Sequence, residues 1–141
     1  MDKKNAHILW FDQLTINDVG LVGGKNASLG EMYRELSSKG VKVPNGFAVT
    51  ATAYRDFLNS AGLPQQIRDI LADLDTSDMN NLSSKGQQVR NAILAAEFPQ
   101  SLKDEIVDAY GHLCKEYGEM TDTAVRSSAT AEYLPGASFA G

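Results

Sequence analysis

Residues 22–37 read VGGKNASLGEMYRELS, and this stretch decides the fold. Its apolar side chains recur at i, i+3, i+4 and i+7, which is the spacing of one face of an α-helix. These side chains are Leu29, Met32, Tyr33 and Leu36. Asn26 or Ser28 can cap the helix at its start, and Gly40 suits the left-handed position that follows a helix end. The pattern therefore predicts a helix of about three turns that begins directly behind a glycine-rich turn.

The flanking segments predict more helices and a few short strands. Short apolar runs predict strands at residues 8–11, 47–49 and 123–126. Helical spacing predicts helices after Thr50, after Pro64, over residues 79–96 and over residues 102–117. A return strand of a hairpin is expected to begin near Ser138, cut short at Gly141. The expected fold class is α+β, mostly helical with a few short strands.

Composition limits the classes of function. A chain of 141 residues suffices for one domain with its own core. Its net charge of −5 argues against a general nucleic-acid binder, which needs a dense basic face. No apolar run approaches the roughly 20 residues that cross a bilayer, and the N-terminus does not resemble a signal peptide. We expect a soluble cytoplasmic domain that binds neither nucleic acid nor membranes.

Metal and thiol chemistry have few candidate residues. Cys114 is the only cysteine, so an internal disulfide is excluded. The histidines, His7 and His112, are too few for a histidine cluster. The interpretation at this stage is that the chain supplies no metal ligands.

The first candidate site is Gly23-Gly24-Lys25, at the start of the predicted helix. Unpaired N–H groups and the positive end of the helix dipole attract phosphate oxygens there, and a lysine adds a cation. The segment is not a Walker A loop, because only three residues separate Gly20 from Gly24 and Asn26 replaces the magnesium-binding Ser or Thr. The alternative is a tight turn followed by a solvated lysine.

The second candidate site is the segment 126–130, RSSAT. Arg126 can grip a phosphate with two parallel hydrogen bonds, and nearby hydroxyl groups can add donors. The hydroxyl side chains are Ser127, Ser128 and Thr130. The alternative is a surface arginine before a polar turn. The two candidate sites support each other if Lys25 and Arg126 converge on one triphosphate in the folded chain.

Three ordered motifs resemble the start of the phosphoenolpyruvate synthases, relatives of pyruvate phosphate dikinase. The motifs are residues 22–32 (VGGKNASLGEM), 43–50 (VPNGFAVT) and 124–132 (AVRSSATAE), the last continuing to residue 141. Residues 9–14 (LWFDQL) favour the synthase over the dikinase. The resemblance spans nearly the whole chain.

The resemblance implies that residues 1–141 are the first part of an ATP-grasp-like nucleotide-binding domain. In such enzymes ATP, pyruvate and water become phosphoenolpyruvate, AMP and phosphate, and a histidine on a separate domain carries the phosphoryl group. Lys25 then matches a lysine that contacts ATP phosphates, and Arg126 matches the catalytic arginine that grips the transferred phosphoryl end. Gly23 and Gly24 line the same loop, and the segment that ends with residues 138–141 resembles the hairpin loop that closes over the nucleotide.

The resemblance also implies cofactors, and binding groups and partners that lie outside this chain. ATP and Mg²⁺ would be the cofactors, with the magnesium ligands outside this chain, and the partners would be pyruvate and the other domains of a longer protein. We expect the chain alone to be inactive and to bind MgATP in the millimolar range, a free energy of about 4 kcal/mol. Tyr133 stands where the family usually has an aspartate, and the loss of this carboxylate would remove either a loop hydrogen bond or a polar contact near the nucleotide.

Two other hypotheses remain open at this stage. The chain could be a stand-alone, non-catalytic binding module that uses its helical face to dock a protein. It could also be a subdomain of a related dikinase or antibiotic phosphotransferase, because the domains that choose the acceptor are absent from it.

Overall fold

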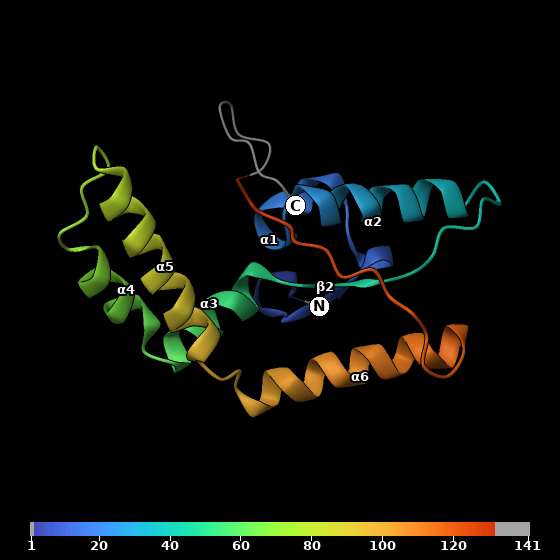
Figure 1. Cartoon of the computed structure of the whole chain (residues 1–141). Coiled ribbons are helices and arrows are strands. Elements are labelled where there is room, and N and C mark those ends of the chain that lie inside the picture. Colours follow the sequence, from blue (N-terminus) through green and yellow to red (C-terminus); the bar gives the residue numbers. More distant parts are fainter. Residues whose placement is uncertain (1, 132–141) are drawn as a thin grey trace. The chain divides into compact units, whose positions relative to one another are not determined.

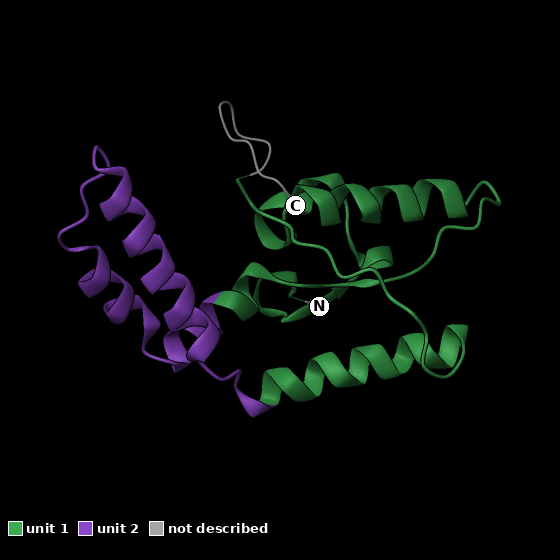
Figure 2. Cartoon of the chain, in the orientation of Figure 1, with its two compact units in different colours: residues 1–54, 101–141 green, residues 55–100 purple. Residues whose placement is uncertain are grey.

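The computed structural model describes residues 2–131, which fall into two units (Figures 1 and 2). Unit 1 takes residues 1–54 and 101–141 of the chain, and unit 2 takes residues 55–100. The expected hairpin at the C-terminus and Tyr133 lie outside the described residues. The described part is mostly helical with one small sheet, so the predicted fold class is confirmed.

The sheet of unit 1 pairs two of the three expected strands. Strand β1 (Ile8–Trp10) is antiparallel to β2 (Phe47–Val49), with Leu9 opposite Ala48. Both of these side chains are buried, in a core cluster that consists of Leu9, Leu14, Val22, Ala27 and Ala48. The sheet therefore joins the N-terminus to the segment that follows the first long helix.

The third expected strand, at residues 123–126, does not form within the described part of the chain. A strand needs a neighbour to complete its ladder of hydrogen bonds, and no described segment pairs with these residues. Val125 is 94% exposed, so its β-branched side chain gains no packing from the described residues. The strand prediction for these residues is therefore wrong, because local strand propensity does not supply a pairing partner.

Short helical turns lead from β1 to the first long helix. They are η2 (Phe11–Gln13), η3 (Ile16–Asp18) and α1 (Val19–Val22). The Asp18 carboxylate accepts hydrogen bonds from Thr15 N at 2.8 Å and from Lys3 Nζ at 2.9 Å. It thereby ties η3 to the preceding η1 turn (Lys3–Asn5).

Acid is expected to weaken the Asp18 contacts. Partial burial raises the pKa of the Asp18 carboxyl, but hydrogen bonds from Lys3 and Thr15 outweigh burial and bring this pKa below its ordinary 3.8. The carboxylate therefore contributes stability above pH 3.8, and this contribution is lost as pH falls through the folded pKa. We expect Asp18→Asn to lower the free energy of unfolding by about 1 kcal/mol at pH 7 and by less at pH 3, which lies below the ordinary carboxyl pKa.

Urea unfolding of the chain and of Asp18→Asn at both pH values measures this difference. Asp122→Asn, which removes an exposed carboxylate, is the matched control. An equal loss of stability at pH 7 and pH 3 would contradict the electrostatic explanation.

The predicted long helix is α2 (Gly24–Ser37), and its existence is confirmed. It begins at Gly24, earlier than either expected cap, and the Asn26 side chain instead donates a hydrogen bond to Val22 O at 2.9 Å. Its buried residues are the small ones, Gly24, Ala27 and Gly30, whereas Met32 on the apolar stripe is 48% exposed. Small residues are buried because η2 and the chain after it pack directly against the helix backbone.

Three helices, α3 (Ala51–Ser60), α4 (Leu63–Leu71) and α5 (Met79–Ala95), follow β2. The helix predicted after Thr50 is α3, and Thr50 caps it, since its Oγ1 accepts a hydrogen bond from Ala53 N at 3.2 Å. Gly62 adopts φ +65° between α3 and α4, and Pro64 lies in the first turn of α4. Within unit 2, the rings of Phe57 and Phe98 meet edge to face at 4.9 Å.

The last helix of unit 1, α6 (Gln100–Tyr117), leads into the segment that carries Arg126. Residues 119–131, here called the return segment, run back past β2 to the beginning of α2 (Figure 1). Its first residues are held by the Tyr110 hydroxyl, which donates to Thr121 O at 2.9 Å. The fold thus brings the end of the return segment against the start of α2. None of the helices in residues 2–131 is long and apolar enough to span a membrane.

Candidate phosphate-binding site

Gly23 forms the turn at which α1 ends and α2 begins. Its N–H donates to Val19 O at 2.8 Å, and its carbonyl accepts from Ala27 N at 3.0 Å. The backbone angles at Gly23 are φ +80° and ψ 164°, a region that side chains with a Cβ rarely adopt. This turn places Lys25 in the first turn of α2, where helical N–H groups lack partners within the helix.

The return segment contacts this same turn. Gly24 N donates a long hydrogen bond of 3.4 Å to Ala129 O. A Cβ added to Gly23 would overlap Ser128 Oγ and would lie 2.9 Å from Ala129 N. The glycine is therefore needed for two reasons, its backbone conformation and the close approach of the return segment.

One open pocket of about 410 Å³ lies where the two segments meet. It is lined by Lys25 from α2 and by Val125, Arg126 and Ser127 from the return segment. The two cationic residues of the predicted sites therefore share one pocket, although most of the chain separates them in sequence. Two positive charges close to a helix N-terminus favour an anion.

The other residues of the predicted site do not all line this pocket. Gly23 and Gly24 are buried in the turn, and Thr130 is exposed in a turn beyond the pocket lining. Ser127 lines the pocket, whereas Ser128 Oγ is buried against Gly23 without a hydrogen-bond partner among the described residues. Sequence reasoning missed Val125 as a lining residue, since the only available signal was its place next to Arg126.

The lining residues suit phosphate oxygens better than a metal ion. Lys25, Arg126 and the Ser127 hydroxyl are hydrogen-bond donors, while Mg²⁺ prefers carboxylate or water oxygens. Within residues 2–131, no three His, Cys, Asp or Glu side chains are grouped so that they could hold a metal ion. We therefore assign no metal ligand to the described part of the chain.

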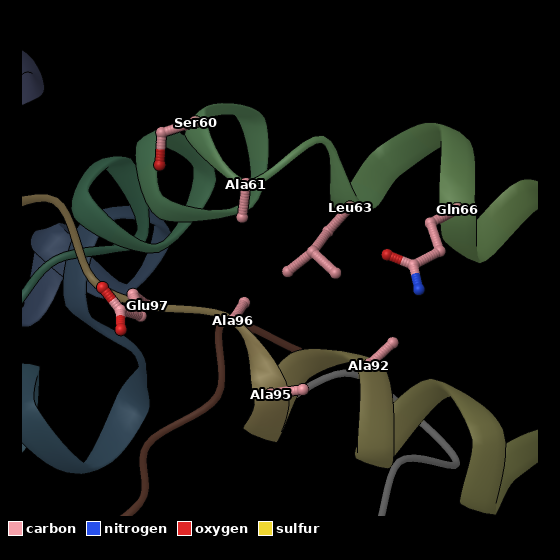
Figure 3. Close-up of a pocket in the computed structure, with 8 residues that line it drawn as sticks. All are labelled: Ser60, Ala61, Leu63, Gln66, Ala92, Ala95, Ala96 and Glu97. Atoms are coloured by element: carbon pink, nitrogen blue, oxygen red, sulfur yellow. The ribbon is translucent and has the colours of Figure 1, made fainter.

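A second pocket, of about 440 Å³, belongs to unit 2. Figure 3 shows Leu63 and Gln66 of α4 on one side of it and Ala92 near the end of α5 on the other. Glu97 is the charged residue of its lining. A negative charge among small apolar side chains disfavours phosphate, so this pocket is a poor alternative to the first.

The described part of the chain is mostly helical, and two cationic residues share a pocket at a helix N-terminus. These features define a class of domain suited to binding anionic groups. Residues 19–141 match the family described as pyruvate phosphate dikinase, AMP/ATP-binding domain. The match covers well over half of the chain, and the chain belongs to this family. The resemblance proposed from the sequence motifs is thereby confirmed.

Several phosphoenolpyruvate synthases are similar to the chain. The identity is 56% with the enzyme of Synechocystis sp., over 99% of this chain and 18% of that protein. It is 51% with the enzyme of Aquifex aeolicus, over 100% of this chain and 17% of that protein. It is 49% with the Escherichia coli K12 enzyme, over 95% of this chain and 17% of that protein. The chain thus spans less than a fifth of the length of these relatives.

Proposed function

We propose that this chain provides part of the ATP-phosphate-binding surface of a phosphoenolpyruvate synthase. The observation that carries the proposal is the pocket shared by Lys25 and Arg126. Membership of an AMP/ATP-binding domain family supports a nucleotide as the anion. Similarity to three phosphoenolpyruvate synthases favours pyruvate over an antibiotic as the acceptor in the complete reaction.

This proposal assigns a different role in phosphate binding to each polar side chain of the site. Lys25 contacts phosphate oxygens as a mobile point charge beside the N–H groups of α2. Arg126 grips the transferred phosphoryl end and offsets the charge that builds up on it, which makes it the catalytic residue of the chain. Ser127 adds a hydroxyl donor in the pocket wall. Thr130 is proposed to assist from the adjoining turn.

The complete reaction requires groups that the described residues do not supply. Mg²⁺ would be held by carboxylates elsewhere in a longer protein and would neutralise part of the phosphate charge. We propose that such a protein turns ATP, pyruvate and water into phosphoenolpyruvate, AMP and phosphate in the cytoplasm. The 141-residue chain alone is expected to bind MgATP weakly and to catalyse nothing.

A titration of MgATP into the ¹⁵N-labelled chain tests the proposed site. We expect amide shifts to change at residues 23–28 and 126–130, because these loops surround the pocket. Adenosine, which lacks phosphates, is the matched control and should leave both loops unchanged. Shifts centred on the helices between residues 51 and 117 would count against the assignment.

A further inference from the structure

Ser128 contacts the Gly23 turn in a way that its neighbour Ser127 does not. The Ser128 hydroxyl oxygen occupies the space in which a Cβ at position 23 would lie. This oxygen is buried and has no hydrogen-bond partner among the described residues. Burying a hydroxyl without a partner is unfavourable, so the position of Ser128 requires an explanation.

Two roles for Ser128 can be compared. As a phosphate ligand, its hydroxyl would have to face the pocket, as Ser127 does. The pocket is instead lined by Lys25, Val125, Arg126 and Ser127, while Ser128 Oγ faces the glycine turn. As a packing residue, Ser128 needs only to be small enough to lie against a glycine. The observed contacts agree with the second role.

Each of the two residues in the Gly23–Ser128 contact has a cationic residue near it in the sequence. Lys25 is two positions after Gly23, and Arg126 is two positions before Ser128. Two residues of backbone reach at most about 7 Å. The distance between these two segments at the Gly23–Ser128 contact therefore limits how far apart Lys25 and Arg126 can be.

We propose that Ser128 is a positioning residue, whose small side chain lies against Gly23 and sets the separation of Arg126 from Lys25. Its hydroxyl does not bind the phosphates. The effect on nucleotide binding rests on the proposed function, whereas the packing role can be tested without any nucleotide.

Paired substitutions at the two serines separate the hydroxyl from the size of the side chain. Ser128→Ala removes only the hydroxyl, and its affinity for MgATP is expected to stay within twofold of the unmodified chain. Ser128→Val adds bulk against Gly23 and is expected to weaken the affinity at least fivefold. At the control position, Ser127→Ala and Ser127→Val should weaken it to a similar extent, since both remove a donor from the pocket wall.

A measurement without nucleotide shows whether the effect comes from positioning. Ser128→Val should shift the amide signals of Gly24 and Lys25 in the ligand-free chain, and Ser127→Val should leave them in place. Circular dichroism and thermal unfolding check that each variant is folded. If Ser128→Val does not fold, Ser128→Thr supplies added bulk while keeping the hydroxyl, and the same shifts and weakened affinity are expected.

The outcomes distinguish the two proposals. A loss of affinity in Ser128→Ala as large as in Ser128→Val would make the hydroxyl a ligand and overturn the positioning role. Unchanged Gly24 and Lys25 signals in a folded Ser128→Val variant would also overturn it. If Ser128→Val shifts those signals but the unmodified chain shows no response to MgATP, the positioning role stands and the proposed function fails.

Discussion

Lys25→Ala is expected to weaken MgATP binding about tenfold, and Arg126→Ala at least as much. Hydrogen bonds to charged groups contribute about 1.5–3 kcal/mol, and 1.4 kcal/mol corresponds to a factor of ten in affinity. Arg126 should have the larger effect because a guanidinium can form two parallel bonds to one phosphoryl group. Isothermal titration calorimetry or amide shifts give the dissociation constants.

Lys39→Ala is the matched control for this pair of substitutions. It changes the net charge by the same amount, but Lys39 is exposed in the turn that follows α2, at the opposite end of the helix from Lys25. Its effect on MgATP affinity should be small and should disappear as salt screens exposed charges. If Lys39→Ala weakens binding as much as Lys25→Ala, the affinity reflects overall charge and not the pocket.

The double variant tests whether Lys25 and Arg126 bind the same triphosphate. Residues that share one ligand are energetically coupled, so their separate losses should not add. We expect the double substitution to cost less binding free energy than the sum of the two single ones. Strict additivity would mean that the two cations act on separate anions.

Gly30→Ala is expected to lower the free energy of unfolding by about 3 kcal/mol, the upper part of the range for overpacked positions. A Cβ at Gly30 would overlap Leu14 Cβ and lie 3.0 Å from Phe11 O. The Leu14 side chain is fully buried, and the other close atom belongs to the backbone of η2, so neither can move freely. Urea unfolding monitored by circular dichroism measures the loss.

Gly111→Ala is the control for this substitution, with an expected effect of opposite sign. Gly111 also lies within a helix, but a Cβ there would meet no described atom within 4 Å outside its own helix and neighbours. Alanine should therefore stabilise α6 by about 0.5–1 kcal/mol through helix propensity alone. Equal effects at Gly30 and Gly111 would show that close packing of α2 is not what requires glycine.

Gly30→Ala also tests whether the packing of α2 against η2 affects the phosphate-binding site. Because α2 carries Lys25 at its first turn, a shift of α2 away from η2 would move this cation relative to Arg126. We expect MgATP affinity to fall in Gly30→Ala and to stay unchanged in Gly111→Ala.

The helices and the family could be predicted from the sequence because both depend on patterns between near neighbours. Thr50 caps α3 and Gly62 separates two helices through preferences of their own backbone and side chains. The motifs around Lys25 and Arg126 likewise identify the family without any knowledge of their distance in space.

The tertiary structure alone decided which surfaces meet. Periodicity identified α2 but favoured its large apolar residues as the packed face, whereas the structure buries Gly30, against the close approach of η2, and Ala27. The tertiary structure also gives the two neighbouring serines different surroundings: Ser127 lines the pocket, whereas Ser128 lies against Gly23. The physical reason is that helix spacing and caps act between nearby residues, whereas a close contact depends on the segment that folds against it from elsewhere in the chain.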